Sequence, residues 1–351
     1  MSTPATSFSS EERHRKQSRG VLLHDTPPLS PRYSDTASAA DDHSTETDSD
    51  SDVEERTKDQ IAFDEIIKVV SKQREGIHTE GVDSNPTFHL SRKQRSYTDL
   101  LRRLQHCGLL QFFEGLRLRW DADSGELVLI LMADPIQECF KTKFDYGLTF
   151  ALNRIAETTP ALADLIKDID LGAHSPVQKA DLSARSSPDG QVYFGNAPYP
   201  SFVYESAHSE TEAELQKSTH QYFEKWPGAI GAVLCFKFSH DNQGNDPNFE
   251  YAASVSLWTA TLDKDGNMIE KQVSDQTFWQ EGKDLTGILK LPLQLFVPPY
   301  LREAVPEDIH DTFVCVDFKD MGKWMAYAVK RQRIAAAGPV PQVLGILKRT
   351  T

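Results

Sequence analysis

A nearly unbroken apolar run at residues 229–238 places the strongest constraint on how this chain can fold. The run has the length of a β-strand, and a strand without polar alternation is buried on both faces, as in the centre of a covered sheet. The residues before it predict a helix from Ser209 to Lys225, because Ser209 and Glu212 form a capping-box pattern and Pro227-Gly228 ends the helix. A helix that leads directly into a buried strand indicates an α+β fold in which helices flank a sheet.

The rest of the chain supplies elements of both kinds. Residues 116–132 predict a hairpin with its turn at Asp123-Ser124-Gly125, and Pro135 opens a helix, since proline suits the first helical turn. A second hairpin is expected from residues 249–262 and 268–273. Further strands are expected at 191–194, 201–205, 289–296 and 313–318, and further helices at 59–72, 97–113 and 323–337.

The composition divides the chain into four parts. Residues 1–58 form an acidic, Ser-rich tail, in which eight acidic and no basic residues lie between Asp41 and Glu55. Such a segment cannot bury enough apolar surface to offset its ordering entropy, so we expect it to be disordered. It is either a solvating tail or a segment that binds a protein partner. A helical N-terminal region is expected at 59–115, an α/β domain at 116–338 and a C-terminal tail at 339–351.

The charge balance bears on nucleic-acid binding. The formal net charge is -14, from 38 Lys+Arg and 52 Asp+Glu. This excess argues against a general nucleic-acid coat protein, because such proteins bind phosphate mainly through Lys and Arg. Nucleic acid would have to bind at a local basic surface, and the most basic stretch contains Arg92, Lys93, Arg95, Arg102 and Arg103. This stretch is either a solvated helix face or a contact surface for a polyanion.

Several sequence features bear on the cellular location. No apolar run reaches the ~18 residues that a membrane helix needs, so we expect no membrane contact. The N-terminus lacks the charged-then-apolar layout of a secretory signal. The four cysteines, at positions 107, 139, 235 and 315, form no CxxC pair. We therefore expect an intracellular protein, nuclear or cytoplasmic, that is not secreted.

Two acids stand at the ends of predicted strands. Asp189 lies in Pro188-Asp189-Gly190, just before the strand at 191–194, and Glu205 ends the strand at 201–205. Two carboxylates on adjacent strands can hold Mg²⁺, which can then polarise a phosphoryl oxygen and generate hydroxide. Each acid also has a plain structural interpretation, since Asp-Gly is a common turn dipeptide and a strand end often reaches the surface.

The residues around both acids resemble a known family. Residues 188–194 (PDGQVYF), 200–206 (PSFVYES), Ser209-Glu210 and 217–222 are similar to the restriction-endonuclease domain of the PD-(D/E)XK nuclease superfamily, in its divergent fungal branch. The resemblance covers about Leu116 to Leu295. It implies a restriction-endonuclease-like mixed sheet flanked by helices, and metal-dependent phosphodiester hydrolysis as the activity.

Carried over residue by residue, the resemblance implies a set of site residues. Asp189 would be the first metal ligand and Glu205 the second, and Glu138 matches an acidic position that often assists the metal. The superfamily has a lysine two residues after the glutamate, where this chain has Ala207. Lys217, in the following helix, is the matching candidate for that lysine. The implied cofactor is Mg²⁺, for which Mn²⁺ can substitute.

Two functions remain open on the sequence. The first is a metal-dependent nuclease, active or degenerate, and the order of Asp189, Glu205 and Lys217 favours it. The second is a non-enzymatic interaction scaffold that keeps the nuclease fold and uses the acidic tail or the basic helix for partners. The acidic net charge and Ala207 favour the second, as does Ser201, which stands where related chains often have an acid. No Gly-rich phosphate loop, GxSxG elbow or HExxH helix occurs, so kinases, elbow-type hydrolases and zincin proteases are not indicated.

Overall fold

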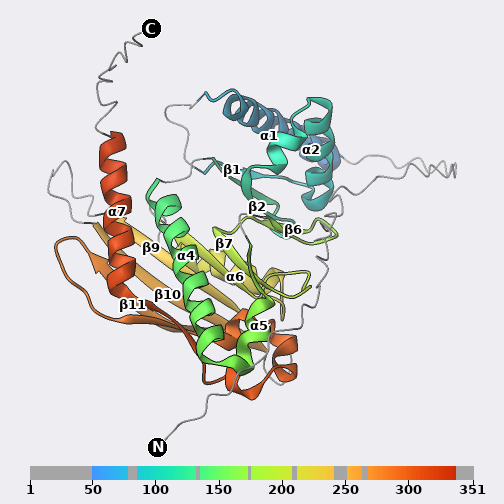
Figure 1. Cartoon of the computed structure of the whole chain (residues 1–351). Helices are drawn as coiled ribbons and strands as arrows, with labels where there is room; N and C mark the ends of the chain where they lie inside the picture. Colours follow the sequence, from blue (N-terminus) through green and yellow to red (C-terminus); the bar gives the residue numbers. More distant parts are fainter. Residues whose placement is uncertain are drawn as a thin grey trace, which may run out of the picture. The chain divides into compact units, whose positions relative to one another are not determined.

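A six-stranded mixed sheet, in the order β11-β10-β9-β8-β7-β4, forms the centre of the fold (Figure 1). Its strands are β4 (Ile169–Gly172), β7 (Gly190–Phe194), β8 (Phe202–Ala207), β9 (Ala232–His240), β10 (Tyr251–Leu262) and β11 (Met268–Gln280). Neighbouring strands are antiparallel except β8 and β9, which run parallel. Helix α6 (Glu212–Lys225) lies between β8 and β9 in the chain and provides the crossover that a parallel pair requires. The expected α+β class and the central strand near 229–238 are confirmed.

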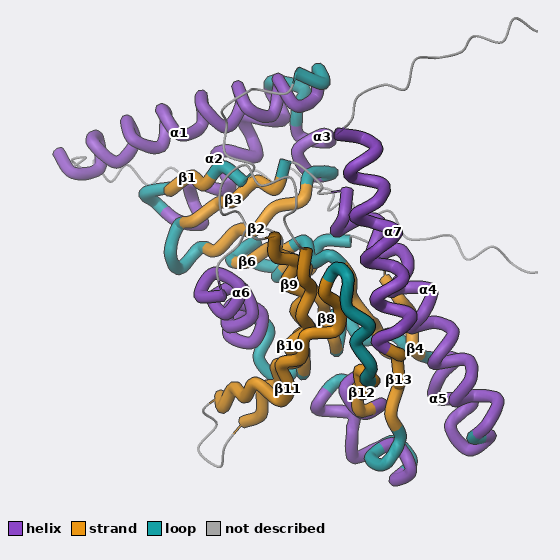
Figure 2. Tube along the Cα trace, turned by 90° about the vertical axis from the view of Figure 1, so that its left-hand side faces the viewer, coloured by secondary structure: helices purple, strands orange, loops and turns teal. Residues whose placement is uncertain are grey.

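Helices cover both faces of this sheet. Helices α4 (Pro135–Thr158) and α7 (Phe318–Ala336) share a core with Phe202 and Tyr204 of β8, whereas α6 shares a core with Val203 and Ala207 of the same strand. Because side chains alternate along a strand, these two pairs point to opposite faces. Figure 2 shows α6 and α7 on opposite sides of β8, β9 and β10. The α4 face also holds the two-stranded sheet of β12 (Ile288–Pro292) and β13 (Phe313–Asp317), α5 (Ala163–Lys167) and the short helices η1 (Pro160–Leu162), η2 (Leu293–Phe296), η3 (Pro299–Ala304) and η4 (Glu307–Ile309).

The N-terminal helices and the first hairpin form a second layer with its own core. A five-stranded sheet in the order β1-β3-β2-β6-β5 carries α1 (Asp50–Arg74), α2 (Lys93–His106) and α3 (Leu110–Glu114). Its strands are β1 (Thr87–His89), β2 (Arg117–Asp121), β3 (Glu126–Ile130), β5 (Val177–Gln178) and β6 (Ala184–Ser186). Leu100 and Leu104 of α2 lie in one buried cluster with Leu118 and Leu127 of the hairpin. The boundary expected at residue 116 therefore falls between elements that bury each other's apolar faces.

Three predicted segments differ from the structure in kind. Helix α1 begins at Asp50, so the last part of the expected tail, up to residue 58, is helical. The single helix expected at 97–113 is two helices, because the chain turns at Gly108, whose φ of +66° suits glycine. The strand expected at 289–296 ends at Pro292, and the short helix η2 follows it.

The computed structural model describes residues 50–77, 85–131, 135–172, 175–207, 212–240, 251–262 and 268–336. All of these residues belong to one compact unit, Asp48–Thr351. Most of the expected acidic tail, the expected C-terminal tail and the Ser209 cap lie outside the described residues. Within the described ranges, every helix is too short or too polar to cross a membrane.

Candidate carboxylate site

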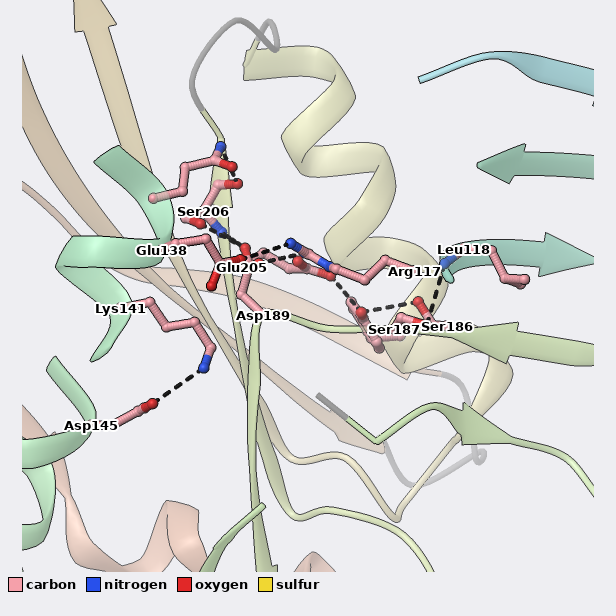
Figure 3. A network of polar contacts seen from close by, with 12 residues as sticks. Arg117, Leu118, Glu138, Lys141, Asp145, Ser186, Ser187, Asp189, Glu205 and Ser206 are labelled. Atoms are coloured by element: carbon pink, nitrogen blue, oxygen red, sulfur yellow. Dashed lines mark hydrogen bonds and ion pairs between the residues drawn. The ribbon is translucent and has the colours of Figure 1, made fainter. Parts of the chain in front are cut away.

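Asp189 and Glu205 lie on neighbouring strands of the six-stranded sheet. Asp189 comes directly before β7, and Glu205 lies in β8, where Tyr204 is the register partner of Gly190. The backbone N–H and the hydroxyl of Ser206 both donate to Oδ2 of Asp189, each at 2.6 Å. Asp189 is 1% exposed and Glu205 is 8% exposed. The structure therefore brings the two predicted acids together, in a buried place (Figure 3).

Arg117 is the cation that faces these acids. It begins β2, in the other sheet, and its guanidinium forms an ion pair with Oδ1 of Asp189. A second nitrogen of the same guanidinium lies 3.6 Å from Oε1 of Glu138, near the start of α4. Burial alone would lower the pKa of Arg117, but Asp189, Glu205 and Glu138 raise it above its ordinary value. Arg117 therefore stays charged and neutralises the site from within.

Glu205 is held in a different way. Burial, and then the charge of Asp189, raise its pKa to about 7, although Arg119, Arg117 and a hydrogen bond from Tyr222 act in the opposite direction. The Tyr222 hydroxyl donates to Oε1 of Glu205 and accepts from the hydroxyl of Ser186 at 2.9 Å. Glu205 is therefore protonated in a large fraction of molecules near neutral pH.

Lys217 does not contact the two acids. Its side chain on α6 is 60% exposed, and its ammonium lies 3.1 Å from Oε2 of Glu126 on β3. The charges that shift the pKa of Glu205 do not include Lys217. Ala207, two residues after Glu205, is 1% exposed and packs in the apolar cluster under α6. The structure thus brings together Asp189, Glu205 and Glu138, and pairs Lys217 with a residue of the other sheet.

A second lysine, Lys141, lies close in sequence to the site without joining it. It is 7% exposed on α4 and pairs with Asp145 at 3.2 Å. The hydroxyl of Tyr204 also donates to Asp145, and Tyr204 packs in the core on the α4 face of the sheet. Glu205 follows Tyr204 on β8 and points to the opposite face, towards Tyr222 of α6. Lys141 therefore belongs to a separate polar pair (Figure 3).

Sequence reasoning missed the residues that neutralise and orient the two acids. Arg117 and Arg119 stand two apart on β2, a spacing that puts both side chains on one face of the strand. That spacing was a usable signal, but it does not say which carboxylates the arginines meet. Ser206 and Tyr222 lie in the segments that carry the resemblance, but the resemblance assigns neither of them a role.

The residues present do not fit a divalent cation in this arrangement. Both oxygens of Asp189 have partners, Arg117 and Ser206, and Oε1 of Glu205 accepts from Tyr222. In the part of the chain that the structure describes, no three His, Cys, Asp or Glu side chains are grouped so that they could hold a metal. A metal would need oxygen ligands that face an open position, and the guanidinium of Arg117 lies against those oxygens instead.

The basic stretch at 92–103, for which a solvated helix face and a polyanion surface were the two alternatives, has most of its arginines paired within the chain. Arg92 pairs with Asp59 at 3.4 Å, and Arg102 pairs with Asp99 at 3.0 Å. Arg103 lies 3.4 Å from Asp64 of α1. These contacts support the interpretation of this stretch as a helix face with local ion pairs.

Comparison with known proteins finds no family model that matches this chain, and no curated protein that matches it.

Proposed function

We propose that this chain keeps a restriction-endonuclease-like fold as an interaction scaffold and does not hydrolyse phosphodiesters. The fold part of the proposal rests on element order. A helix (α4) precedes the strands that carry Asp189 and Glu205, and α6 then leads into the parallel strand β9. This is the order expected from the resemblance, in a mixed sheet flanked by helices.

The charge balance at the two acids carries the functional part of the proposal. Metal-dependent hydrolysis needs at least two oxygen ligands on the cation, and a positive group near the attacked phosphorus. Here Arg117 pairs with Asp189 and approaches Glu138, so the ligands are already neutralised by the chain itself. A guanidinium carries no metal-bound water and cannot generate hydroxide, since it stays protonated in proteins.

The lysine position supports the same conclusion. The ammonium of Lys217 pairs with Glu126, and the position two residues after Glu205 is a buried alanine. The described residues therefore offer no lysine that contacts Asp189 or Glu205 and could act on a bound phosphate.

The surface of α4 supports the interaction role. Tyr146 and Phe150, one helical turn apart, are 70% and 71% exposed. Neighbouring exposed aromatic side chains form an apolar patch, and aromatic residues are enriched in protein–protein interfaces. The described residues thus present an aromatic face that suits a protein partner.

A cleavage assay with the full chain tests the proposal. Labelled single- and double-stranded DNA and RNA are incubated with the purified protein in Mg²⁺ and in Mn²⁺. We expect no cleavage above that of the matched Glu205→Gln protein, which keeps the shape of the side chain and removes its charge. Cleavage by the wild type that disappears in Glu205→Gln and in Asp189→Asn would overturn the proposal and restore the nuclease interpretation.

A further inference from the structure

We propose that Arg117 is a built-in cation that keeps divalent metals out of the carboxylate site, and that the site binds Mn²⁺ or Mg²⁺ once this guanidinium is removed. The inference rests on the proposed function, because it explains why two acids that share one guanidinium do without a metal. It makes one arginine of the first hairpin the residue that decides between a scaffold and a metal site.

The geometry places Arg117 where a shared cation would sit. One nitrogen of its guanidinium contacts Oδ1 of Asp189, and another lies 3.6 Å from Oε1 of Glu138. The two acids come from a loop before β7 and from α4, whereas Arg117 comes from β2 of the other sheet. A single side chain thus reaches from one layer to acids on two elements of the other (Figure 3).

The carboxylate of Asp189 needs a compensating partner because it is buried. The side chain of Asp189 is 2% exposed and that of Arg117 is 18% exposed. Oδ1 of Asp189 is fully buried and accepts no hydrogen bond of good geometry, so the ion pair with Arg117 is its compensation. A buried carboxylate whose partner is removed must be protonated, or it must recruit another cation.

The charges that remain after removal of Arg117 favour a divalent ion. Asp189 and Glu138, which both approach the guanidinium of Arg117, would then lack their shared cation, and Arg119, which donates to the hydroxyl of Ser218, would be the nearby cation. Carboxylate oxygens are the ligands that Mg²⁺ prefers, and Mn²⁺ accepts the same donors. A monovalent guanidinium and a divalent ion compete for one place, so loss of the first should admit the second.

The experiment compares three full-length proteins: wild type, Arg117→Gln and the matched control Arg119→Gln. Arg119 lies two residues further on the same strand, so its replacement removes the same charge from the same face. Mn²⁺ binding is followed by the loss of the free-ion electron paramagnetic resonance signal, and by the rise of the melting temperature with Mn²⁺. We expect Arg117→Gln to bind one Mn²⁺ at least about tenfold more tightly than wild type and Arg119→Gln.

Two further variants keep the test decisive. Adding Glu138→Gln to Arg117→Gln should remove the gained Mn²⁺ binding, since it deletes one of the two acids that share the guanidinium. Arg117→Met, which leaves more space and no hydrogen bond, should show the same gain, so the result does not depend on the folding of one variant. Mn²⁺ binding that stays equal in wild type, Arg117→Gln and Arg117→Met overturns the inference. That result does not affect the proposed function. The proposed function fails if the wild type binds metal and cleaves DNA or RNA.

Discussion

Asp189 and Glu205 are both buried, yet each is neutralised in its own way. Asp189 forms an ion pair with Arg117 and accepts two hydrogen bonds from Ser206, which replace its contacts with water. Glu205 instead tends to keep its proton, with Tyr222 as its hydrogen-bond partner. A pair of carboxylates without a metal relieves its repulsion in this manner, by pairing one acid and protonating the other.

The raised pKa of Glu205 predicts a pH-dependent stability. The folded state holds this proton up to about pH 7, whereas the unfolded chain releases it near the ordinary value of 4.5. The stability that the folded state gains by holding this proton is therefore fully present below pH 4.5, and it is lost as the pH rises to about 7. By the same linkage, Glu205 makes the protein less stable at pH 8 than at pH 4 by about 3 kcal/mol.

Replacement of Glu205 by glutamine tests this, because glutamine resembles the protonated acid at every pH. We expect Glu205→Gln to match wild type near pH 4 and to be more stable than wild type at pH 8. Urea unfolding at both pH values measures the difference. A Glu205→Gln protein that is equally destabilised at both values contradicts the assigned protonation.

At the scale of elements, the close packing of α4 against α7 holds Glu138 at the edge of the site. Gly147 of α4 lies against the indole of Trp324 of α7, and a Cβ at residue 147 would overlap its ring atoms. Phe140 of α4 also packs against Trp324, with ring centroids 6.4 Å apart. The absence of a side chain at residue 147 therefore sets how near the two helices approach.

Gly147→Ala should destabilise the protein although alanine is the better helix former. The new methyl group forces the two helices apart, at a cost of about 1–3 kcal/mol, against a gain in helix propensity of about 1 kcal/mol. Chemical unfolding measures the net loss. The matched control is Gly115→Ala, whose Cβ would meet only ordinary contacts, with its nearest neighbour at 3.4 Å. If Gly147→Ala is as stable as this control, the packing account of α4 and α7 fails.

Element-level prediction succeeded where local pattern decides structure. The apolar stripe opened by Pro135, the hairpin at 116–132 and the buried strand near 229–238 follow from periodicity and turn residues, and each is present. The site was predictable only in part. Asp189 and Glu205 meet because their strands are neighbours. Lys217 of α6 and Arg117 of β2, in contrast, each pair with a residue of the other layer. Contacts between layers depend on tertiary packing, which a local pattern does not contain.

At the scale of the whole described part, charged contacts join the two layers beside the site. Lys225 at the end of α6 is 6% exposed and pairs with Asp121 at 2.8 Å and with Asp123 at 2.6 Å, both in the first hairpin. Lys217 of the same helix pairs with Glu126, and Arg117 pairs with Asp189. Basic side chains thus join one sheet and its helix to the other sheet.

The most direct test of this account is an anomalous-scattering measurement on crystals of the full chain grown in the presence of Mn²⁺. We predict no anomalous peak between Asp189 and Glu205, and a guanidinium of Arg117 that remains against Asp189. A Mn²⁺ peak coordinated by both acids, with Arg117 turned away from them, would contradict the account and identify the chain as a metal-binding member of the nuclease fold.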